Sequence, residues 1–155
     1  MNDPITWRLA SKRDCRILAE LNQQLIADEG HRDAMNVSEL EGRMKIWLDE
    51  AYEAALFEVG GELAGYALYR AHAGEIYLRH FFVVRHRRRQ GIGRQAMTLL
   101  RGHIWPKAQR LTVSVLAHNE TGVKFWRAMG FQDYCLTLEM ACPDAAPSTK
   151  VDQRG

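Results

Sequence analysis

Five arginines and two glycines lie close together in the stretch RHRRRQGIGRQA, residues 85–96. Guanidinium groups bind phosphate and carboxylate oxygens through paired N–H donors. Glycine has no Cβ, so an anion can closely approach the main-chain N–H groups at Gly91 and Gly93. The stretch therefore predicts a loop that holds an anion, and a diphosphate facing the start of a helix fits this chemistry.

Three other binding devices fit the stretch less well. A P-loop requires Gly-Lys-Ser/Thr, which does not follow here. Residues 91–96 satisfy a relaxed GxGxxA dinucleotide fingerprint, but Leu116 and Ala117 stand where the next strand should end on an acidic residue. A nucleic-acid surface needs arginines spread over a broad face, and the net charge is only +2. A solvated basic loop without a ligand remains the alternative.

The charge of the chain is unevenly distributed. Residues 1–84 carry nine Lys and Arg against fourteen Asp and Glu, whereas residues 85–155 carry twelve against five. We expect the second half to hold an anion and the first half to attract a cation, such as an ammonium group. The candidates for the cation are Asp28, Glu29 and Asp33, for which a hydrated loop is the alternative.

Hydrophobic periodicity and helix caps predict the elements that position the basic loop. Ser11 with Asp14, and Ser38 with Glu41, resemble capping boxes ahead of two helices. Gly60-Gly61 predicts a two-residue hairpin turn. Strands are expected over 5–10, 55–59, 62–70, 75–84, 110–116 and 133–140, and helices over 12–28, 38–50, 92–104 and 119–129.

The predicted order is β-α-α-β-β-β-α-β-α-β, an α/β protein of the α+β kind. The strand, helix and strand around the basic loop require a parallel crossover, so we expect a mixed sheet with helices on its faces. With 155 residues, the chain fits one domain over residues 5–141. Residues 142–155 are rich in Pro, Ala, Ser and Asp, and a disordered tail is expected there.

Two motifs resemble those of the GNAT N-acetyltransferase superfamily. Arg88-x-x-Gly91-x-Gly93 is similar to its acyl-CoA signature, and NETGVKFWRAMGF over 119–131 is similar to its second motif. The strand EIYLRHFFVV resembles that of the polyamine (diamine) acetyltransferases. The resemblance covers residues 5–140 and implies a sheet of six to seven strands with four helices. It also implies transfer of an acetyl group from acetyl-CoA to a primary amine of a small molecule or peptide, by direct attack in a ternary complex.

The resemblance also assigns residues to the cofactor. Phe81, Phe82 and Val83 would lie beside the pantetheine arm, and Asn119 and Phe125 would contact the cofactor from the following helix. Around the pyrophosphate it places Arg88, Arg89, Gln90, Gly91, Ile92, Gly93 and Arg94.

The sequence departs from the family pattern at two catalytic positions. Trp126 stands where a tyrosine often protonates the leaving thiolate, and Arg79 stands where the polyamine relatives have a glutamate base. A guanidinium cannot accept a proton, so Arg79 would instead hold a carboxylate of the acceptor. His80, Tyr77 and Glu75 are the replacement candidates, and alternation puts Glu75 and Tyr77, but not His80, on the face of Arg79. Their structural alternatives are a packed histidine, a core tyrosine and a glutamate paired with Arg79.

The remaining features set expectations about location and partners. Cys15, Cys135 and Cys142 fit neither a disulfide framework nor a zinc site, and the histidines show no metal-binding spacing. Without an apolar leader or a membrane-length apolar run, a cytoplasmic protein without membrane or nucleic-acid partners is expected. The family resemblance allows a homodimer. The rival functions are a non-catalytic acyl-CoA-binding module and a nucleic-acid-binding domain.

Overall fold

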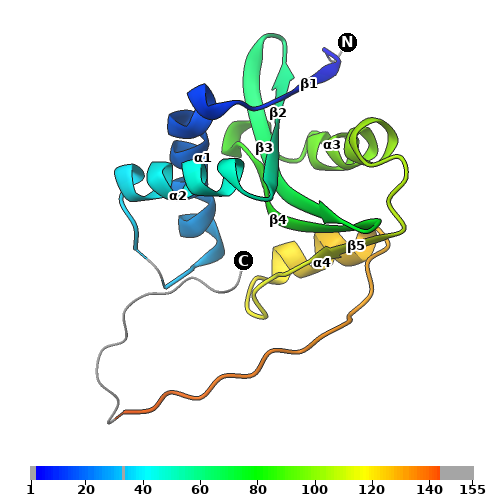
Figure 1. Ribbon diagram of the computed structural model, residues 1–155. Coiled ribbons are helices and arrows are strands. Elements are labelled where there is room, and N and C mark those ends of the chain that lie inside the picture. Colours follow the sequence, from blue (N-terminus) through cyan, green and yellow to red (C-terminus); the bar gives the residue numbers. More distant parts are fainter. Residues whose placement is uncertain (1–2, 33, 144–155) are drawn as a thin grey trace.

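The computed structural model describes residues 3–32 and 34–143, and Figure 1 shows the arrangement of its elements. Asp33, one of the candidates for the cation, lies outside the described residues, as do residues 144–155 of the expected tail. The strands are β1 (Ile5–Leu9), β2 (Tyr52–Val59), β3 (Glu62–His72), β4 (Glu75–Val83) and β5 (Arg110–Val113). The helices are α1 (Cys15–Glu29), α2 (Val37–Asp49), α3 (Ile92–Leu99) and α4 (Glu120–Ala128).

Local signals account for the first two helices. The main-chain N–H of Ser11 donates to Asp14 across 2.8 Å, and a short 3-10 turn over Lys12–Asp14 leads into α1. The capping box predicted from Ser38 is wrong, because Asn36 caps α2 by accepting from the N–H of Glu39 at 2.8 Å. An Asx residue in extended conformation is a strong N-cap, so α2 begins at Val37.

The five strands form one mixed sheet in the order β1-β2-β3-β4-β5. Neighbouring strands from β1 to β4 are antiparallel, and β5 is parallel to β4. The turn between β2 and β3 has positive φ at Gly60 and Gly61, +61° and +78°, which confirms the predicted hairpin. The mixed sheet with four helices confirms the predicted fold class.

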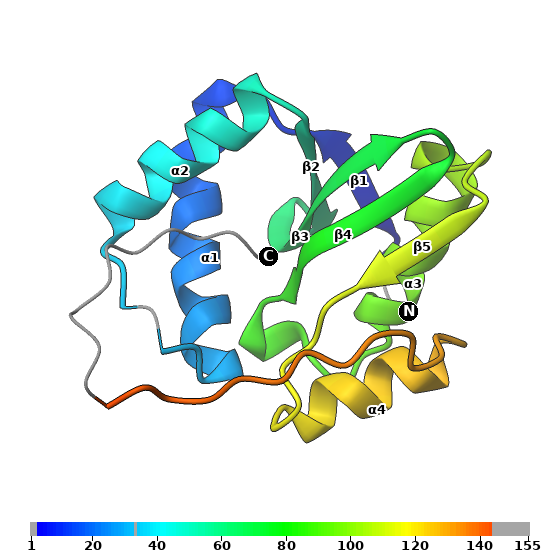
Figure 2. The same ribbon diagram turned by 60° about the horizontal axis from the view of Figure 1, so that its bottom comes forward.

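Helices cover both faces of the sheet. On one face, α1 and α2 enclose a core that includes Leu18, Met44 and Tyr66. On the other face, Met97 of α3 and Trp105 pack on the sheet, and α4 adds partly buried aromatic residues. Figure 2 shows α4 beneath β5. Because β5 is parallel to β4 and α3 lies between them in the chain, the connection from β4 through α3 to β5 is the crossover that the sequence predicts.

The predicted sixth strand over residues 133–140 is not formed. This segment is extended and exposed, and the sheet has five strands rather than six to seven. Figure 2 shows it running past β5 and α4, in orange. Alternating apolar and polar residues indicate that a segment can lie on a sheet, but they do not determine whether it pairs with a strand. β5 is likewise shorter than predicted, ending at Val113 rather than at residue 116.

Candidate active site

β4 and β5 separate halfway along the sheet. Their pairing ends where Leu78 lies opposite Val113, although β4 continues to Val83. Within the described residues, 80–83 of β4 pair with β3 and extend beyond the last pair with β5. Main-chain N–H and C=O groups need partners when buried. This half of β4 therefore offers main-chain donors and acceptors to an extended ligand.

The basic loop follows directly from the half of β4 that extends beyond β5. A 3-10 turn over Arg85–Arg87 leads to Gly91, which precedes α3 as its N-cap residue with φ +77°. Positive φ is the reason for glycine here, because L side chains are strained in that region. Gly91 supplies no capping side chain, so the first N–H groups of α3 point outward with the positive end of the helix dipole.

Gly93 brings α3 and α4 together. A Cβ at this position would lie 3.1 Å from Cε1 of Phe125, which leaves no room for a larger residue without displacing that ring. The ring of Phe125 in turn stacks on Phe81 of β4, with centroids 6.0 Å apart. The structure thus gathers three of the residues assigned to the cofactor from three separate elements. Gly93 has a packing role that the sequence analysis did not predict.

Arginines of the loop are paired with acidic side chains from the first half of the chain. Arg88 donates to Asp28 at 2.5 Å and to the carbonyl of Val83 at 2.9 Å, and Arg85 donates to Asp28 at 2.9 Å. Burial alone would raise the pKa of Asp28, but the hydrogen bonds from Arg88 and Arg85 lower it below its ordinary value. Asp28 is therefore an anion that ties the end of α1 to the basic loop.

The end of α1 also contacts the loop between β5 and α4. The carbonyl of Glu29 lies 3.0 Å from Nε2 of His118. The Glu29 side chain is half-buried, and burial, followed by repulsion from Asp28, raises its pKa to about 7. Next to His118, Asn119 caps α4 by accepting from the N–H of Gly122 at 3.1 Å.

A β-bulge in β4 changes the faces of the candidate catalytic residues. Leu68 of β3 pairs with His80 and Tyr69 pairs with Leu78, so Arg79 is an extra residue on β4. The guanidinium carbon of Arg79 lies 4.3 Å from the ring centroid of Trp47, and the His80 ring meets the same indole edge-on at 5.3 Å. The predicted separation of His80 from Arg79 is therefore wrong, because both residues face α2.

His80 belongs to a buried polar pair that the sequence did not reveal. It is 8% exposed, and its Nδ1 lies 3.0 Å from the hydroxyl of Tyr66. Burial, followed by repulsion from Arg43 and Arg79, keeps the pKa of His80 well below its ordinary value, so the imidazole is neutral. Tyr66 meets His80 because of the register between β3 and β4. Hydrophobic alternation alone does not specify this register.

The other candidates on β4 lie farther from this pair. Glu75 forms an ion pair with Arg110 at 3.8 Å. The expected pairing of Glu75 with Arg79 is wrong, because Arg79 donates to the hydroxyl of Tyr52 at 3.0 Å. The Tyr77 hydroxyl lies 3.5 Å from Ser114 and is not buried.

Trp126 is held in an aromatic cluster. Its ring meets Phe81 at 5.4 Å, Phe125 at 4.9 Å and Phe131 at 5.2 Å, each edge-on. Edge-to-face contacts of this kind stabilise packing between elements. Trp126 therefore has a packing role at the position where the family pattern often has an acidic tyrosine.

In residues 3–32 and 34–143, no group of three or more His, Cys, Asp and Glu side chains is arranged to hold a metal ion. No helix of this part of the chain is both long and apolar enough to cross a membrane.

Residues 17–141 match the family described as an acetyltransferase (GNAT) domain. No curated protein matches the sequence significantly. Among solved structures, the chain is similar to ribosomal-protein-alanine N-acetyltransferase from Brucella melitensis biovar Abortus 2308. The two are 18% identical with a TM-score of 0.69, and the alignment covers 90% of this chain and 100% of that chain.

Two similar structures contain the cofactor or its acetylated form. An aminoglycoside N-acetyltransferase in complex with CoA is 15% identical, with a TM-score of 0.68 over 92% of this chain and 98% of that chain. A predicted acetyltransferase with acetyl-CoA from Clostridium acetobutylicum is 16% identical, with a TM-score of 0.68 over 89% of this chain and 96% of that chain. These likenesses support the fold, and the family match spans most of the sequence, so the chain belongs to the GNAT acetyltransferase family.

Proposed function

We propose that the protein transfers an acetyl group from acetyl-CoA to a primary amine of a small molecule or a peptide. The observation that carries this proposal is the junction of two features, the half of β4 over residues 80–83 that extends beyond its pairing with β5 and the exposed N-terminus of α3. Acetyl-CoA carries a thioester at one end of a long arm and a diphosphate at the other. The arm matches this half of β4, and the diphosphate matches the start of α3. The similar structures that hold CoA or acetyl-CoA add support.

The residues present fit the diphosphate of CoA. Gly91 adopts positive φ and leaves the N–H groups at the start of α3 without a side-chain cap, and Arg89 and Arg94 add positive charge nearby. Preorganised N–H donors at a helix start are a general device for binding phosphate. We propose contacts to the cofactor from Phe81, Phe82, Val83, Arg88, Arg89, Gln90, Gly91, Ile92, Gly93, Arg94, Asn119 and Phe125.

When bound, acetyl-CoA supplies an acetyl carbonyl activated as a thioester. In the proposed reaction, the neutral amine attacks that carbon, a C–N bond forms and the C–S bond breaks. Sulfur leaves as a thiolate, and the amine nitrogen gives up one proton. Main-chain N–H groups of residues 81–83 would stabilise the carbonyl oxygen, and the rate would come chiefly from positioning and from this stabilisation.

Glu29 is our proposed partner for the acceptor amine. It lies beside Asp28, which binds the basic loop, and its carbonyl contacts His118 of the β5–α4 loop. A carboxyl group with a pKa of about 7 can accept a proton near neutral pH. His80, Tyr77 and Glu75 stay secondary candidates for moving that proton.

The acceptor class is narrowed by Arg79. Its guanidinium faces Trp47 together with that of Arg43, which lies 4.5 Å from the same ring. A guanidinium in contact with the acceptor would favour a carboxylate over an ammonium group, so an amine that also carries a carboxylate is our proposed acceptor. The resemblance to the polyamine branch finds no support in the similar structures, whose names specify a ribosomal-protein alanine and an aminoglycoside.

A non-catalytic acyl-CoA-binding module is the second candidate. The packing of Trp126 among three aromatic rings favours it, because no acid then stands at the usual position for the leaving thiolate. A thiolate is a tolerable leaving group without such an acid. We retain transfer as the first proposal. A homodimer, a cytoplasmic location and the absence of a metal and of nucleic-acid partners stay predictions.

The test combines turnover with binding. We expect release of free CoA thiol from acetyl-CoA with at least one member of a panel of amino acids, peptides, aminoglycosides and polyamines. Gly91→Asp should abolish CoA binding in calorimetry, because it adds bulk and negative charge at the start of α3. The matched control is Gly61→Asp, which has the same positive φ at an open turn on the hairpin. CoA binding without turnover on any amine would favour the second candidate, and binding that persists in Gly91→Asp would contradict both.

A further inference from the structure

The helix α1 ends in a Schellman motif, with Gly30 at φ +67° directly after the last helical residue. The N–H groups of Gly30 and His31 donate to carbonyls of the preceding turn, at 3.3 and 3.1 Å. The last carbonyls of a helix have no partner within the helix, and that of Glu29 lies 3.0 Å from Nε2 of His118. Since a carbonyl only accepts, Nε2 of His118 carries the proton and donates it.

The His118 ring also packs closely on this end of α1. A Cβ at position 30 would lie 3.3 Å from Nε2 of His118, so a larger residue than Gly30 would crowd the imidazole. Positive φ and the nearby ring therefore both favour glycine there. Histidine side chains that donate to the last carbonyls of a helix also interact favourably with its dipole. The contact joins α1 to the β5–α4 loop, two segments far apart in the chain.

A second anchor holds the same end of α1 to the basic loop. Asp28 accepts from Arg88 and from Arg85. Figure 2 shows the end of α1 near the loop that leads into α4, so this end is held on two sides. Because Arg88 is among the residues proposed for the diphosphate, CoA competes with Asp28 for its guanidinium. The contact with His118 uses neither arginine, so it can persist when Asp28 is displaced.

We propose that His118 is a positioning residue, which holds the end of α1 and the Glu29 side chain in place when CoA displaces Asp28. The inference rests on the proposed function, in which Glu29 faces the acceptor amine. Asn119, next to His118, caps α4 and is one of the proposed contacts to the cofactor. The β5–α4 loop therefore connects the cofactor to the residue that meets the acceptor. His118 touches neither substrate and acts through Glu29.

Hydrogen exchange tests this anchor without substrate. The amides of Gly30 and His31 report on the end of α1, because both are hydrogen-bonded there. Asp28→Ala removes the other anchor, as CoA is proposed to do, and should leave these two amides protected. In Asp28→Ala/His118→Phe their exchange should be faster by about threefold to tenfold, which corresponds to the loss of one hydrogen bond. Equal protection in the single and the double variant would overturn the proposal.

Steady-state kinetics with acetyl-CoA and an amine that turns over tests the effect on Glu29. His118→Phe should raise KM for the amine by about threefold to tenfold. We expect kcat to change less, and the affinity for CoA to change little. His118→Gln should restore KM, because its amide N–H takes the place of the Nε2–H group. A raised KM that His118→Gln does not restore would overturn the proposal, since the hydrogen bond would not be its cause.

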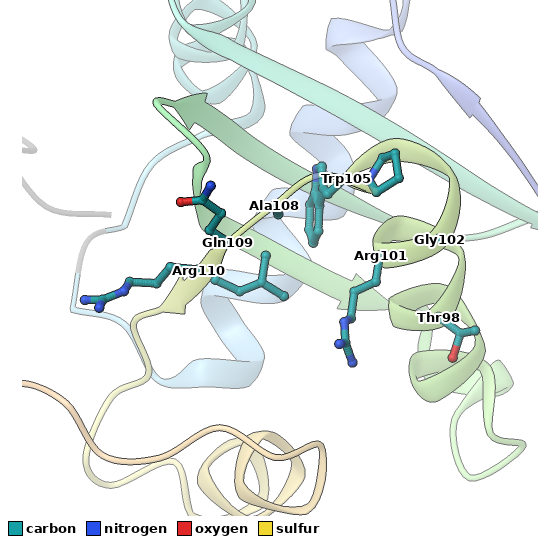
Figure 3. A pocket seen from close by; sticks show the side chains of 9 residues that line it. Thr98, Arg101, Gly102, Trp105, Ala108, Gln109 and Arg110 are labelled. Carbon is teal, nitrogen blue, oxygen red and sulfur yellow. The ribbon is translucent and has the colours of Figure 1, made fainter.

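His103→Phe is the control for the change from histidine to phenylalanine. His103 lies in the π-helical turn Leu100–Ile104, and its ring centroid lies 6.5 Å from that of Trp7. Arg101 and Gly102 of the same turn line a hollow of about 400 Å³ beside the start of β5, which Figure 3 shows. His118 instead follows the end of β5. His103→Phe should change neither KM for the amine nor the exchange of the α1 amides.

The two measurements separate this inference from the proposed function. If an amine turns over and His118→Phe has the KM of the wild type, the positioning role is wrong and acetyl transfer stands. If no amine turns over but the α1 amides lose protection in Asp28→Ala/His118→Phe, acetyl transfer is contradicted and the anchor is supported.

Discussion

The guanidinium of Arg88 donates to the carboxylate of Asp28 across 2.5 Å, which joins the basic loop to the end of α1. Asp28 was a candidate for attracting the cationic acceptor, and in the structure its carboxylate binds Arg88 and Arg85. The same arginine side chain that could face a diphosphate therefore has an internal anion as its partner. Release of that anion is expected to accompany cofactor binding.

Asp28→Asn should increase the affinity for CoA by about threefold. A change of this size corresponds to the free energy of a partly exposed ion pair. The substitution removes an anion that competes with phosphate for Arg88. Calorimetric titration with CoA measures the effect. Asp133→Asn is the control, because Asp133 pairs with Arg127 at 2.7 Å, away from the loop. This substitution should leave the affinity for CoA unchanged. Weaker binding in Asp28→Asn would mean that the ion pair shapes the loop for the cofactor.

Gly93→Ala should weaken CoA binding, because its Cβ would lie 3.1 Å from the ring of Phe125 and push it outward. Gly102→Ala is the matched control, since a Cβ there has no atom within 4 Å. Gly102 lies in the π-helical turn Leu100–Ile104 that continues α3. Alanine is about 1 kcal/mol more favourable than glycine in helical backbone, so Gly102→Ala should not lower the unfolding free energy. Equal CoA affinity in the two variants would show that the position of Phe125 is irrelevant to the cofactor.

The pKa of Glu29, about 7, predicts a rise of activity with pH through the neutral range. Between the ordinary pKa of Glu29 and about 7, the folded protein keeps this group protonated while the unfolded chain ionises it. The contribution of Glu29 to the unfolding free energy therefore falls as pH rises through this range. Glu29→Gln should therefore raise the unfolding free energy at pH 8 by about 1 to 3 kcal/mol, and have no effect well below the ordinary pKa.

Glu29→Gln should also remove the rise of kcat/KM near neutral pH. A denaturation series at several pH values and a pH profile of thiol release check the two effects. Glu20→Gln is the comparison, because Glu20 lies on an exposed turn of the same helix. An unchanged pH profile in Glu29→Gln would exclude Glu29 as the proton acceptor.

Removing the hydroxyl from Tyr66 should leave Nδ1 of His80 buried without its partner. We expect Tyr66→Phe to lower the unfolding free energy by about 1 to 3 kcal/mol, the typical cost of an unsatisfied buried group. Tyr77→Phe is the control, because the Tyr77 hydroxyl is not buried. Chemical denaturation measures both variants, and equal losses would contradict the buried pair.

Some parts of this molecule could be predicted from residue types alone. The hairpin at Gly60-Gly61, the start of α3 after Gly91 and the cap of α4 at Asn119 depend on local backbone preferences, and all three are present. The family motifs sit in these same local features. Short-range chemistry is therefore enough to locate the loop that we propose as the diphosphate cradle.

Other parts could not be predicted because they depend on pairing between distant segments. The bulge at Arg79 is fixed by the register of β3 against β4, and it turns Arg79 and His80 toward one helix. Likewise, the alternation over 133–140 indicates an amphipathic strand, but this segment forms no strand of the described sheet. Periodicity gives the face of a residue only while the register is unbroken.

A crystal structure of the protein with CoA tests the central claim most directly. The account predicts diphosphate oxygens within hydrogen-bond distance of the main-chain N–H groups that follow Gly91, with the pantetheine arm along residues 81–83 of β4. A cofactor bound elsewhere, with the start of α3 vacant and the β4 main chain uncontacted, would contradict it.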